Sequence, residues 1–324
     1  MIPTLVTVGI TSFNAANTIE AAVASALEQT LKPLEVIIVD DCSTDNSSGI
    51  LKSLASLHEA VKIFSNFKNL GVAQTRNRIL ELAKGEFVAF FDDDDVSLPE
   101  RLEKQLARIL AYEQEYASRA MVLCHAARLV KYPDGSEQVQ PTIGQRENCI
   151  APHGLAVAKR AVLGTPLKDA YGSCPTCSQM ARLSTYRSVR GFDPNFRRGE
   201  DSDLLVRLAK AGGHIVGIAE PLVIQTMTKT SEKSLAAERH YALMFLEKHR
   251  DVADSEGLYE FCHQWLIIKY TWLEQEWQKF ALRLLVVSIR YPLATLNRFT
   301  LSTRNFAINR SFSQFHRSVN SSDD

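Results

Sequence analysis

The sequence predicts an α/β protein built on a mostly parallel central sheet with helices on both faces. In residues 1–91, four short apolar runs alternate with three segments of helical periodicity. This alternation is typical of parallel strands joined by helical crossovers. Polar groups follow three of the expected strands, which is where open parallel sheets bind ligands. Beyond about residue 227 the pattern becomes helical throughout, so a helical C-terminal extension is expected.

Composition and charge exclude some classes of protein. The 324 residues include 37 basic and 37 acidic side chains, so net charge gives no reason to expect a nucleic-acid partner. Residues 1–14 lack the basic and long apolar segments of a secretory signal. No run reaches the about 18 apolar residues of a transmembrane helix. Six scattered cysteines favour reduced thiols, and we therefore expect a cytoplasmic protein.

Local signals place the individual elements. A capping-box pattern, with Asn17 three positions before Glu20, predicts the start of the first helix. Gly71 opens a later helix, and Pro99 suits the first turn of the next one. Residues 140–180 show no clear periodicity and are expected to be rich in loops. The expected strands are residues 5–10, 34–39, 61–64, 87–91, 121–130 and 214–224.

Four consecutive aspartates, Asp92 to Asp95, follow the strand expected at residues 87–91. Two carboxylates about 4 Å apart repel by about 4 kcal/mol at an effective dielectric constant of about 20. An isolated acidic run is most simply a solvated turn. In a parallel sheet, however, these aspartates would meet two other polar strand ends, Thr11 to Asn14 and Asp40-Asp41. This convergence favours a site that holds a cation.

Four segments, in this order, carry a resemblance to a known family. They are LVTVGITSFNAANTIEAAVASALEQT, LEVIIVDDCSTDNS, NLGVAQTRNRILELAKGEFVAFFDDDD and GFDPNFRRGEDSDLLVRLAKAG. Together they resemble glycosyltransferase family 2, nucleotide-sugar-dependent enzymes of the GT-A fold. The resemblance implies a catalytic domain over residues 1–225. Its nucleotide-sugar half would be residues 1–100 and its acceptor half residues 101–225, followed by the extension at residues 226–324.

The resemblance implies a divalent cation, Mn²⁺ or Mg²⁺, held by a D-x-D motif against the diphosphate of the donor. The matching positions are Asp92 and Asp94, although four consecutive aspartates contain two overlapping D-x-D patterns. Hard carboxylate oxygens suit these ions.

The resemblance also implies contacts with the rest of the donor. Asp41 matches the carboxylate that accepts from the uracil ring N–H, and Arg76 stands where a basic residue often lies near the diphosphate. A surface arginine on a helix is the simpler alternative for Arg76. The other matching donor positions are Thr11, Phe13, Asn14, Asp40 and Asp93.

Glu200 and Asp201 match the family's E-D motif. The resemblance implies that Asp201 is the base that takes the acceptor proton and that Glu200 supports it. The reaction would be one in-line displacement with inversion and no covalent intermediate. For Asp203, a favourable charge at a helix N-terminus, worth about 0.3–1 kcal/mol, is the simpler interpretation.

The expected function is the inverting, metal-dependent transfer of one sugar from a nucleotide-sugar donor, preferably UDP-linked. The expected acceptor is a hydroxyl of a glycan or lipid-linked oligosaccharide, in the biosynthesis of O-antigen, capsule or exopolysaccharide. The Q-x-x-R-W motif of processive relatives is absent, which favours single addition. The alternatives are a catalytically silent GT-A module that binds nucleotide or glycan, and a nucleotidyltransferase, although the latter would need a glycine-rich loop near residue 11.

The C-terminal residues are aromatic and increasingly basic. From Ala281 onward there are six arginines against only Asp323 and Asp324. A helical subdomain packed on the catalytic core is the simpler interpretation. The alternative is a peripheral anchor at the inner face of the cell membrane. Cys174 and Cys177 have C-x-x-C spacing but lack the strand-helix context of a redox motif, so they are expected to pack.

Overall fold

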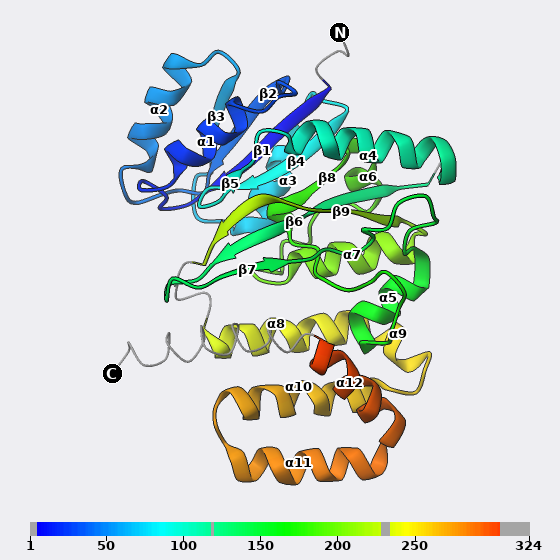
Figure 1. The fold of residues 1–324 in the computed structure, drawn as a ribbon. Helices are drawn as coiled ribbons and strands as arrows, with labels where there is room; N and C mark the ends of the chain where they lie inside the picture. The colour runs from blue at the N-terminus through cyan, green and yellow to red at the C-terminus, as the bar shows by residue number, and fades with distance from the viewer. Residues whose placement is uncertain (1–4, 118–119, 228–233, 305–324) are drawn as a thin grey trace.

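The computed structural model describes residues 5–117, 120–227 and 234–304. One mixed sheet forms its centre, with strand order β3-β2-β1-β4-β8-β6-β9-β5 and β7 paired to β6. Helices α1, α2 and α4 cover one face of the sheet, and α3, α5, α6 and α7 cover the other (Figure 1). The α/β architecture expected from the sequence is therefore confirmed.

The N-terminal half is the parallel part of the sheet. The strands β1, β2, β3 and β4 pair in parallel, and each crossover contains a helix. Its strands are β1 (Val6–Ser12), β2 (Glu35–Asp40), β3 (Val61–Ser65) and β4 (Phe87–Asp92), and its helices are α1 (Ile19–Leu27), α2 (Ser47–Leu57) and α3 (Val72–Leu82). The strand β2 is buried along its whole length, as a continuous apolar run predicts for a strand covered on both faces.

The second half adds antiparallel pairs to this sheet. The strand β8 lies antiparallel between β4 and β6, and the long strand β9 runs parallel to β6. A register shift opposite Ala126 and Ala127 accommodates Pro221 without ending β9. The strands are β5 (Val96–Ser97), β6 (Val122–Lys131), β7 (Glu137–Gln140), β8 (Gln179–Arg182) and β9 (His214–Thr226), and the helices are α4 (Arg101–Tyr116), α5 (Gly154–Leu163), α6 (Leu183–Ser188) and α7 (Glu200–Lys210).

One local expectation was wrong and another was incomplete. The helix α1 begins at Ile19 with Thr18 at its N-cap, and neither Asn17 nor Thr18 supplies a side-chain cap. The Ala15 carbonyl accepts from the Ile19 amide instead, at 2.9 Å. The segment expected to be loop-rich contains α5, which ends at Gly164 in the left-handed conformation that favours glycine, with φ 66°.

In the described part of the chain after the sheet there are five helices: α8 (Leu235–Lys248), α9 (Arg250–Asp254), α10 (Tyr259–Leu273), α11 (Trp277–Arg290) and α12 (Pro292–Arg304). The expected helical extension reaches residue 324, but residues 305–324 lie outside the described residues. Leu246, Phe261 and Val287 of this region share one hydrophobic core with the sheet. A separate domain beginning at residue 226 therefore stays a prediction. Among the described residues, none of the helices has the length and apolarity needed to cross a membrane.

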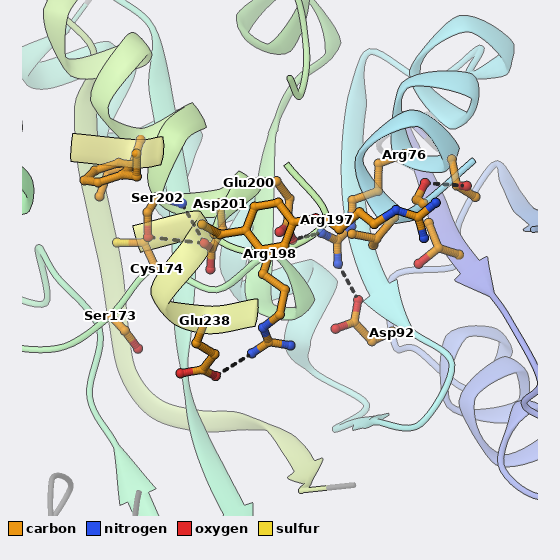
Figure 2. Close-up of a pocket in the computed structure, with 18 of the residues that line it drawn as sticks. Arg76, Asp92, Ser173, Cys174, Arg197, Arg198, Glu200, Asp201, Ser202 and Glu238 are labelled. Carbon is orange, nitrogen blue, oxygen red and sulfur yellow. Dashed lines mark hydrogen bonds and ion pairs between the residues drawn. The ribbon is translucent and has the colours of Figure 1, made fainter. Parts of the chain in front are cut away.

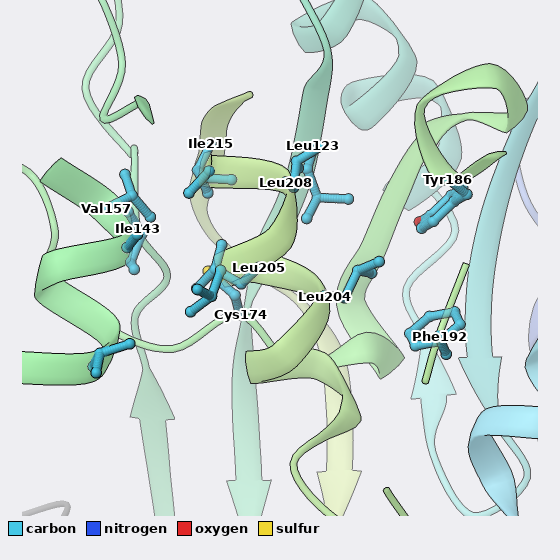
Figure 3. Close-up of a cluster of buried hydrophobic side chains, with 14 of the residues drawn as sticks. Leu123, Ile143, Val157, Cys174, Tyr186, Phe192, Leu204, Leu205, Leu208 and Ile215 are labelled. Atoms are coloured by element: carbon cyan, nitrogen blue, oxygen red, sulfur yellow. The ribbon is translucent and has the colours of Figure 1, made fainter. Parts of the chain in front are cut away.

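The helix α7 lies at the centre of this core. Its leucines at 204, 205 and 208 point into the side chains of α5, β6 and β9 (Figure 3). They follow the i, i+1, i+4 spacing of one helix face. At the other end of the cluster, Phe90 of β4 makes edge-to-face contacts with Tyr186 and Phe192. This packing fixes the position of the first turn of α7, which carries Glu200 and Asp201.

Asp203, also in the first turn of α7, joins the sheet to the C-terminal helices. Its buried carboxylate accepts from Arg207 Nε at 2.8 Å, Lys248 Nζ at 2.5 Å and His249 Nε2 at 3.0 Å. Burial alone would raise the pKa of Asp203, but these bonds lower it to about 2. The interpretation of Asp203 as a simple helix-terminal charge is therefore incomplete, because it is the centre of a buried ion cluster.

Replacing Asp203 with Asn should lower the free energy of unfolding by about 3–5 kcal/mol, because it removes the buried carboxylate shared by Arg207, Lys248 and His249. Since the pKa of Asp203 is lower in the folded protein than in the unfolded chain, its contribution is present above about pH 4. This contribution to the free energy of unfolding, about 2 kcal/mol in total, is lost as pH falls toward 2. Urea unfolding across this pH range measures both quantities.

The matched control is Asp251→Asn, which removes an ion pair between Lys210 and a carboxylate that is 61% exposed. This change should cost about 0–1 kcal/mol. Equal costs for the two variants would contradict the role given to Asp203.

Candidate active site

Three polar strand ends meet at one edge of the parallel sheet, as the sequence predicted. In the strand register, Thr11 lies beside Asp92 and Ser12 lies beside Asp40. A cavity of about 1020 Å³ opens there. Its walls include these predicted residues: Thr11, Phe13, Asn14, Asp41, Arg76, Asp92, Asp93, Asp94, Glu200 and Asp201. Asp40 is buried outside this lining and accepts from the Ser43 amide.

The Asp41 carboxylate already accepts hydrogen bonds from other residues of the protein. It accepts from Asn66 Nδ2 at 2.7 Å, the Leu70 amide at 2.9 Å and the Gly71 amide at 2.8 Å. Gly71 has φ 87° and directly precedes α3. Asp41 therefore fixes the loop from Asn66 to Gly71 and, through it, the start of the helix that carries Arg76.

The first loop is held in a similar way. Asn14 Oδ1 accepts from the Thr44 amide at 2.8 Å, and the Asn14 amide donates to Ser43 Oγ at 2.9 Å. The Phe13 amide donates to Asp93 Oδ2 at 2.9 Å. The Phe13 ring is exposed at the cavity wall. These bonds give the loops after β1, β2 and β4 one fixed arrangement.

Arg76 is the central cation of the site. Its guanidinium binds Asp92 Oδ1 through Nη2 at 2.9 Å and Glu200 Oε1 through Nη1 at 2.5 Å (Figure 2). It also lies over the Phe192 ring, with its Cζ 5.6 Å from the centroid. Burial disfavours the charged guanidinium, but Asp92 and Glu200 outweigh this and raise the pKa of Arg76. A surface arginine is therefore excluded.

A second buried arginine lies beside the aspartates. Arg101 is fully buried, stacks 4.2 Å over the Phe91 ring and donates to the Phe90 carbonyl at 2.8 Å. Burial lowers the pKa of Arg101 to about 10, opposed by the nearby Cys177, Asp92 and Asp95. The sequence analysis missed this cation, although Arg101 shares a helix face with the apolar Leu102 and Leu106.

The four aspartates occupy different environments. Burial raises the pKa of Asp93 to about 8, with further contributions from Asp94 and Asp92. Asp95 is buried with its Oδ2 unpaired among the described residues, and its Oδ1 accepts from the Thr226 amide at 3.2 Å. Ligand atoms of Asp92, Asp95 and Cys177 lie within 4.8 Å of one another. The Cys177 thiol, expected only to pack, thus lies against two carboxylates.

The first turn of α7 brings the E-D motif into the same cavity. Glu200 is buried and bound to Arg76, whereas Asp201 is partly exposed in the cavity (Figure 2). Asp201 Oδ1 accepts from the Ser202 amide at 2.6 Å. Cys174 lines the cavity nearby. The position of the Asp201 carboxylate is therefore fixed by the helix and by the Ser202 amide, and one side of it faces the cavity. A carboxylate that accepts a proton from a bound hydroxyl needs such an open side.

The far wall of the cavity comes from the C-terminal helices, which the sequence analysis did not predict. The helix α8 contributes Tyr241 and Phe245, and α10 contributes Lys269 and Tyr270. Arg198 Nη2 binds Glu238 Oε1 of α8 at 3.1 Å, which ties this wall to the loop before α7 (Figure 2). The wall combines aromatic rings with charges, a composition suited to sugars and phosphates.

The mixed sheet and the helices that cover it define a GT-A type fold. Among solved structures, the chain is similar to S. aureus TarS residues 1–349 in complex with UDP-GlcNAc, with a TM-score of 0.57 at 16% identity. This match covers 93% of the present chain and 91% of that one. The GT-A fold expected from the sequence is thereby confirmed.

Residues 7–155 match the model described as glycosyl transferase family 2, which confirms the resemblance to this family expected from the sequence. It is 44% identical over 102 residues to the putative teichuronic acid biosynthesis glycosyltransferase TuaG of Bacillus subtilis, covering 32% of this chain and 40% of TuaG. It is 37% identical over 106 residues to the UDP-Glc:alpha-D-GlcNAc-diphosphoundecaprenol beta-1,3-glucosyltransferase WfgD of Escherichia coli, covering 33% and 41%. These matches span about two fifths of the relatives' lengths.

Replacing Arg76 with Met should lower the free energy of unfolding by about 3–5 kcal/mol, because it leaves two carboxylates without their shared cation. In a double-mutant cycle with Glu200→Gln, the coupling energy should be about 0.5–3 kcal/mol. Urea unfolding of the four proteins measures it.

Arg78→Met is the matched control on the same helix. Arg78 binds the Ser65 carbonyl and Asn66 Oδ1, not Glu200. It should show no coupling with Glu200→Gln, and coupling as large as that of Arg76 would contradict the assignment.

Proposed function

We propose that the protein is an inverting, metal-dependent glycosyltransferase that moves one sugar from a UDP-sugar to a hydroxyl of a glycan or lipid-linked saccharide. The observation that carries this proposal is that Asp92, Asp94 and Asp201 line one cavity. UDP-GlcNAc in TarS and the UDP-glucose named for WfgD support a UDP-linked donor. The teichuronic acid named for TuaG supports a role in cell-surface polysaccharide biosynthesis.

The donor nucleotide would occupy the wall formed by the first two loops. The exposed Phe13 ring offers a face for the uracil base, with Thr11 and Asn14 nearby. Asp41 already accepts three hydrogen bonds, so any bond from the uracil N–H would use its remaining capacity. We propose that Asp41 acts mainly by shaping this wall, and that Asp93 does the same through Phe13.

The residues at the end of β4 fit a divalent cation. The available ligands are carboxylates, which Mg²⁺ and Mn²⁺ prefer. Burial and repulsion from neighbouring carboxylates raise the pKa values of Asp93 and Asp95, so it is unfavourable to keep all of these groups ionised without a cation. Asp92 and Asp94 line the cavity, whereas Asp95 and Cys177 lie outside the lining. We therefore propose Asp92 and Asp94 as the residues that would hold the ion. When bound, the ion would supply charge neutralisation for the departing diphosphate.

Arg76 and the E-D motif would divide the remaining work. Arg76 binds both Asp92 and Glu200, and it would position the Asp92 carboxylate, which faces the donor. Asp201 would accept the proton of the acceptor hydroxyl while that oxygen attacks the sugar carbon from the side opposite the nucleotide. The displacement is a single step, so the configuration at the anomeric carbon inverts. The aromatic wall at Tyr241, Phe245 and Tyr270 would bind the acceptor.

Asp201→Asn should lower the turnover number for sugar transfer by about 10²- to 10⁴-fold, because the acceptor hydroxyl loses its base. Calorimetric binding of UDP should be unchanged, since Asp201 does not hold the nucleotide wall. UDP release from a panel of UDP-sugars, with and without EDTA, measures the activity. Glu220→Gln, at an exposed ion pair with Lys104, is the control. Full activity of Asp201→Asn would rule out Asp201 as the base.

Asp94→Asn should weaken Mn²⁺ binding by at least about tenfold, because it removes a ligand that faces the cavity. Asp95→Asn and Cys177→Ser should change the affinity less. Mn²⁺ titration followed by electron paramagnetic resonance measures all three variants. The opposite ranking would instead assign the ion to the group of Asp92, Asp95 and Cys177.

A further inference from the structure

A set of exposed apolar side chains lies along α11 and the first turns of α12. We call it the α11–α12 stripe, and its six side chains are between 55% and 77% exposed. They are Leu282, Leu285, Val286, Ile289, Leu293 and Leu296. Eight of the eighteen exposed large apolar side chains in the described part of the chain lie from Trp277 to Phe299. Exposed apolar residues are usually scattered singly, so this concentration indicates a contact surface.

The stripe is not the face by which these helices pack on the protein. Val287 is buried in the main core, and Phe280, Leu284 and Tyr291 pack against that core from the same side. The helix α11 therefore has one apolar face that stabilises the fold and a second set of apolar side chains that is exposed. The helix itself lies beyond α10 as seen from the sheet (Figure 1).

The charge beside the stripe is mostly positive. Residues 277–304 contain five basic residues and neither aspartate nor glutamate. Arg283 and Arg290 line a groove of about 460 Å³ next to Leu282 and Val286. Of the neighbouring elements, α10 contributes Glu260 to this groove, and Glu276 binds Lys279 at 2.5 Å. A partner for this face should thus be apolar at its centre and anionic around it.

We propose that the α11–α12 stripe docks the protein on an anionic phospholipid bilayer. A helix with an apolar face flanked by arginines lies in the membrane interface, with its apolar side chains among the acyl chains and its cations at the phosphates. A second copy of the chain is a poorer match, because a symmetric contact would bring Arg283 and Arg290 against the same cations. Residues 305–324 are also a poorer match, since they carry Arg310 and Arg317 and their two aspartates, Asp323 and Asp324, are confined to the last two positions.

The α11–α12 stripe lies close to the wall of the cavity that is proposed to bind the acceptor, which we call the acceptor wall. The helix α10 supplies Lys269 and Tyr270 to the cavity and packs against α11. The stripe and the acceptor wall are therefore one helix layer apart. Docking would bring the cavity close to a membrane that contains a lipid-linked saccharide. The docking proposal itself does not rest on the proposed transfer reaction, because vesicle binding requires no turnover.

The experiment uses the full chain and sedimentation with vesicles of phosphatidylcholine alone, or of equal parts phosphatidylcholine and phosphatidylglycerol. The protein should bind the anionic vesicles, and added salt should weaken binding. The Ile289→Glu/Leu293→Glu variant should bind at least about tenfold more weakly. Arg283→Glu should weaken binding by about fivefold or more. Leu57→Glu, which changes a side chain on α2 as exposed as Ile289 at 74%, should bind normally.

Three results would overturn the proposal. One is failure of the wild-type protein to bind anionic vesicles at low salt. Another is unchanged binding of the Ile289→Glu/Leu293→Glu variant, which would locate the contact elsewhere in the chain. The third is a dimer in sedimentation velocity that this variant dissociates, without vesicle binding, which would identify a second copy as the partner. Calorimetric UDP binding by each variant shows that the fold is intact, so failure of docking is distinguishable from failure of the transferase function.

Discussion

The buried ion pairs of Arg76 are the constraint on which the site depends. One guanidinium holds Asp92 at the end of β4 and Glu200 at the start of α7, two residues 108 positions apart in the chain. A buried charge without a partner costs several kcal/mol, so neither carboxylate can leave this arrangement freely. The Arg76 side chain thereby links the parallel half of the sheet directly to the helix that carries Asp201.

Arg76 is itself positioned by contacts within the loops. Asp41 holds the amides of Leu70 and Gly71, which fixes the start of α3 one turn before Arg76. On the other side, the leucines of α7 and the Asp203 cluster fix the first turn of that helix. Asp41 was expected to bind the nucleotide and Asp203 was expected to be a helix-terminal charge, yet both hold the elements that form the site in position. Their substitution would therefore change activity without any direct contact with the reacting atoms.

The sequence predicted the parallel half well because its signals are local. Short apolar runs, polar strand ends and the glycine before α3 each identify an element without knowledge of its neighbours. The cavity wall formed by α8 and α10 could not be predicted in this way, since Tyr241 and Lys269 reach the cavity only through long-range packing of these helices. Arg101 was missed for a related reason, because an arginine at a helix start is usually exposed and only the fold buries it.

Charge balance connects the metal proposal to the donor proposal. Six carboxylates, Asp92 to Asp95 with Glu200 and Asp201, lie around two buried arginines, and Arg76 is already shared between two of them. A donor diphosphate would add further negative charge to this region. The raised pKa of Asp93, about 8, reflects the cost of keeping these carboxylates ionised in a buried setting. A divalent cation offsets this cost only where carboxylates and phosphate meet, which is the part of the cavity lined by Asp92 and Asp94. The proposed ion and donor should therefore bind cooperatively, each raising the affinity for the other by the same factor.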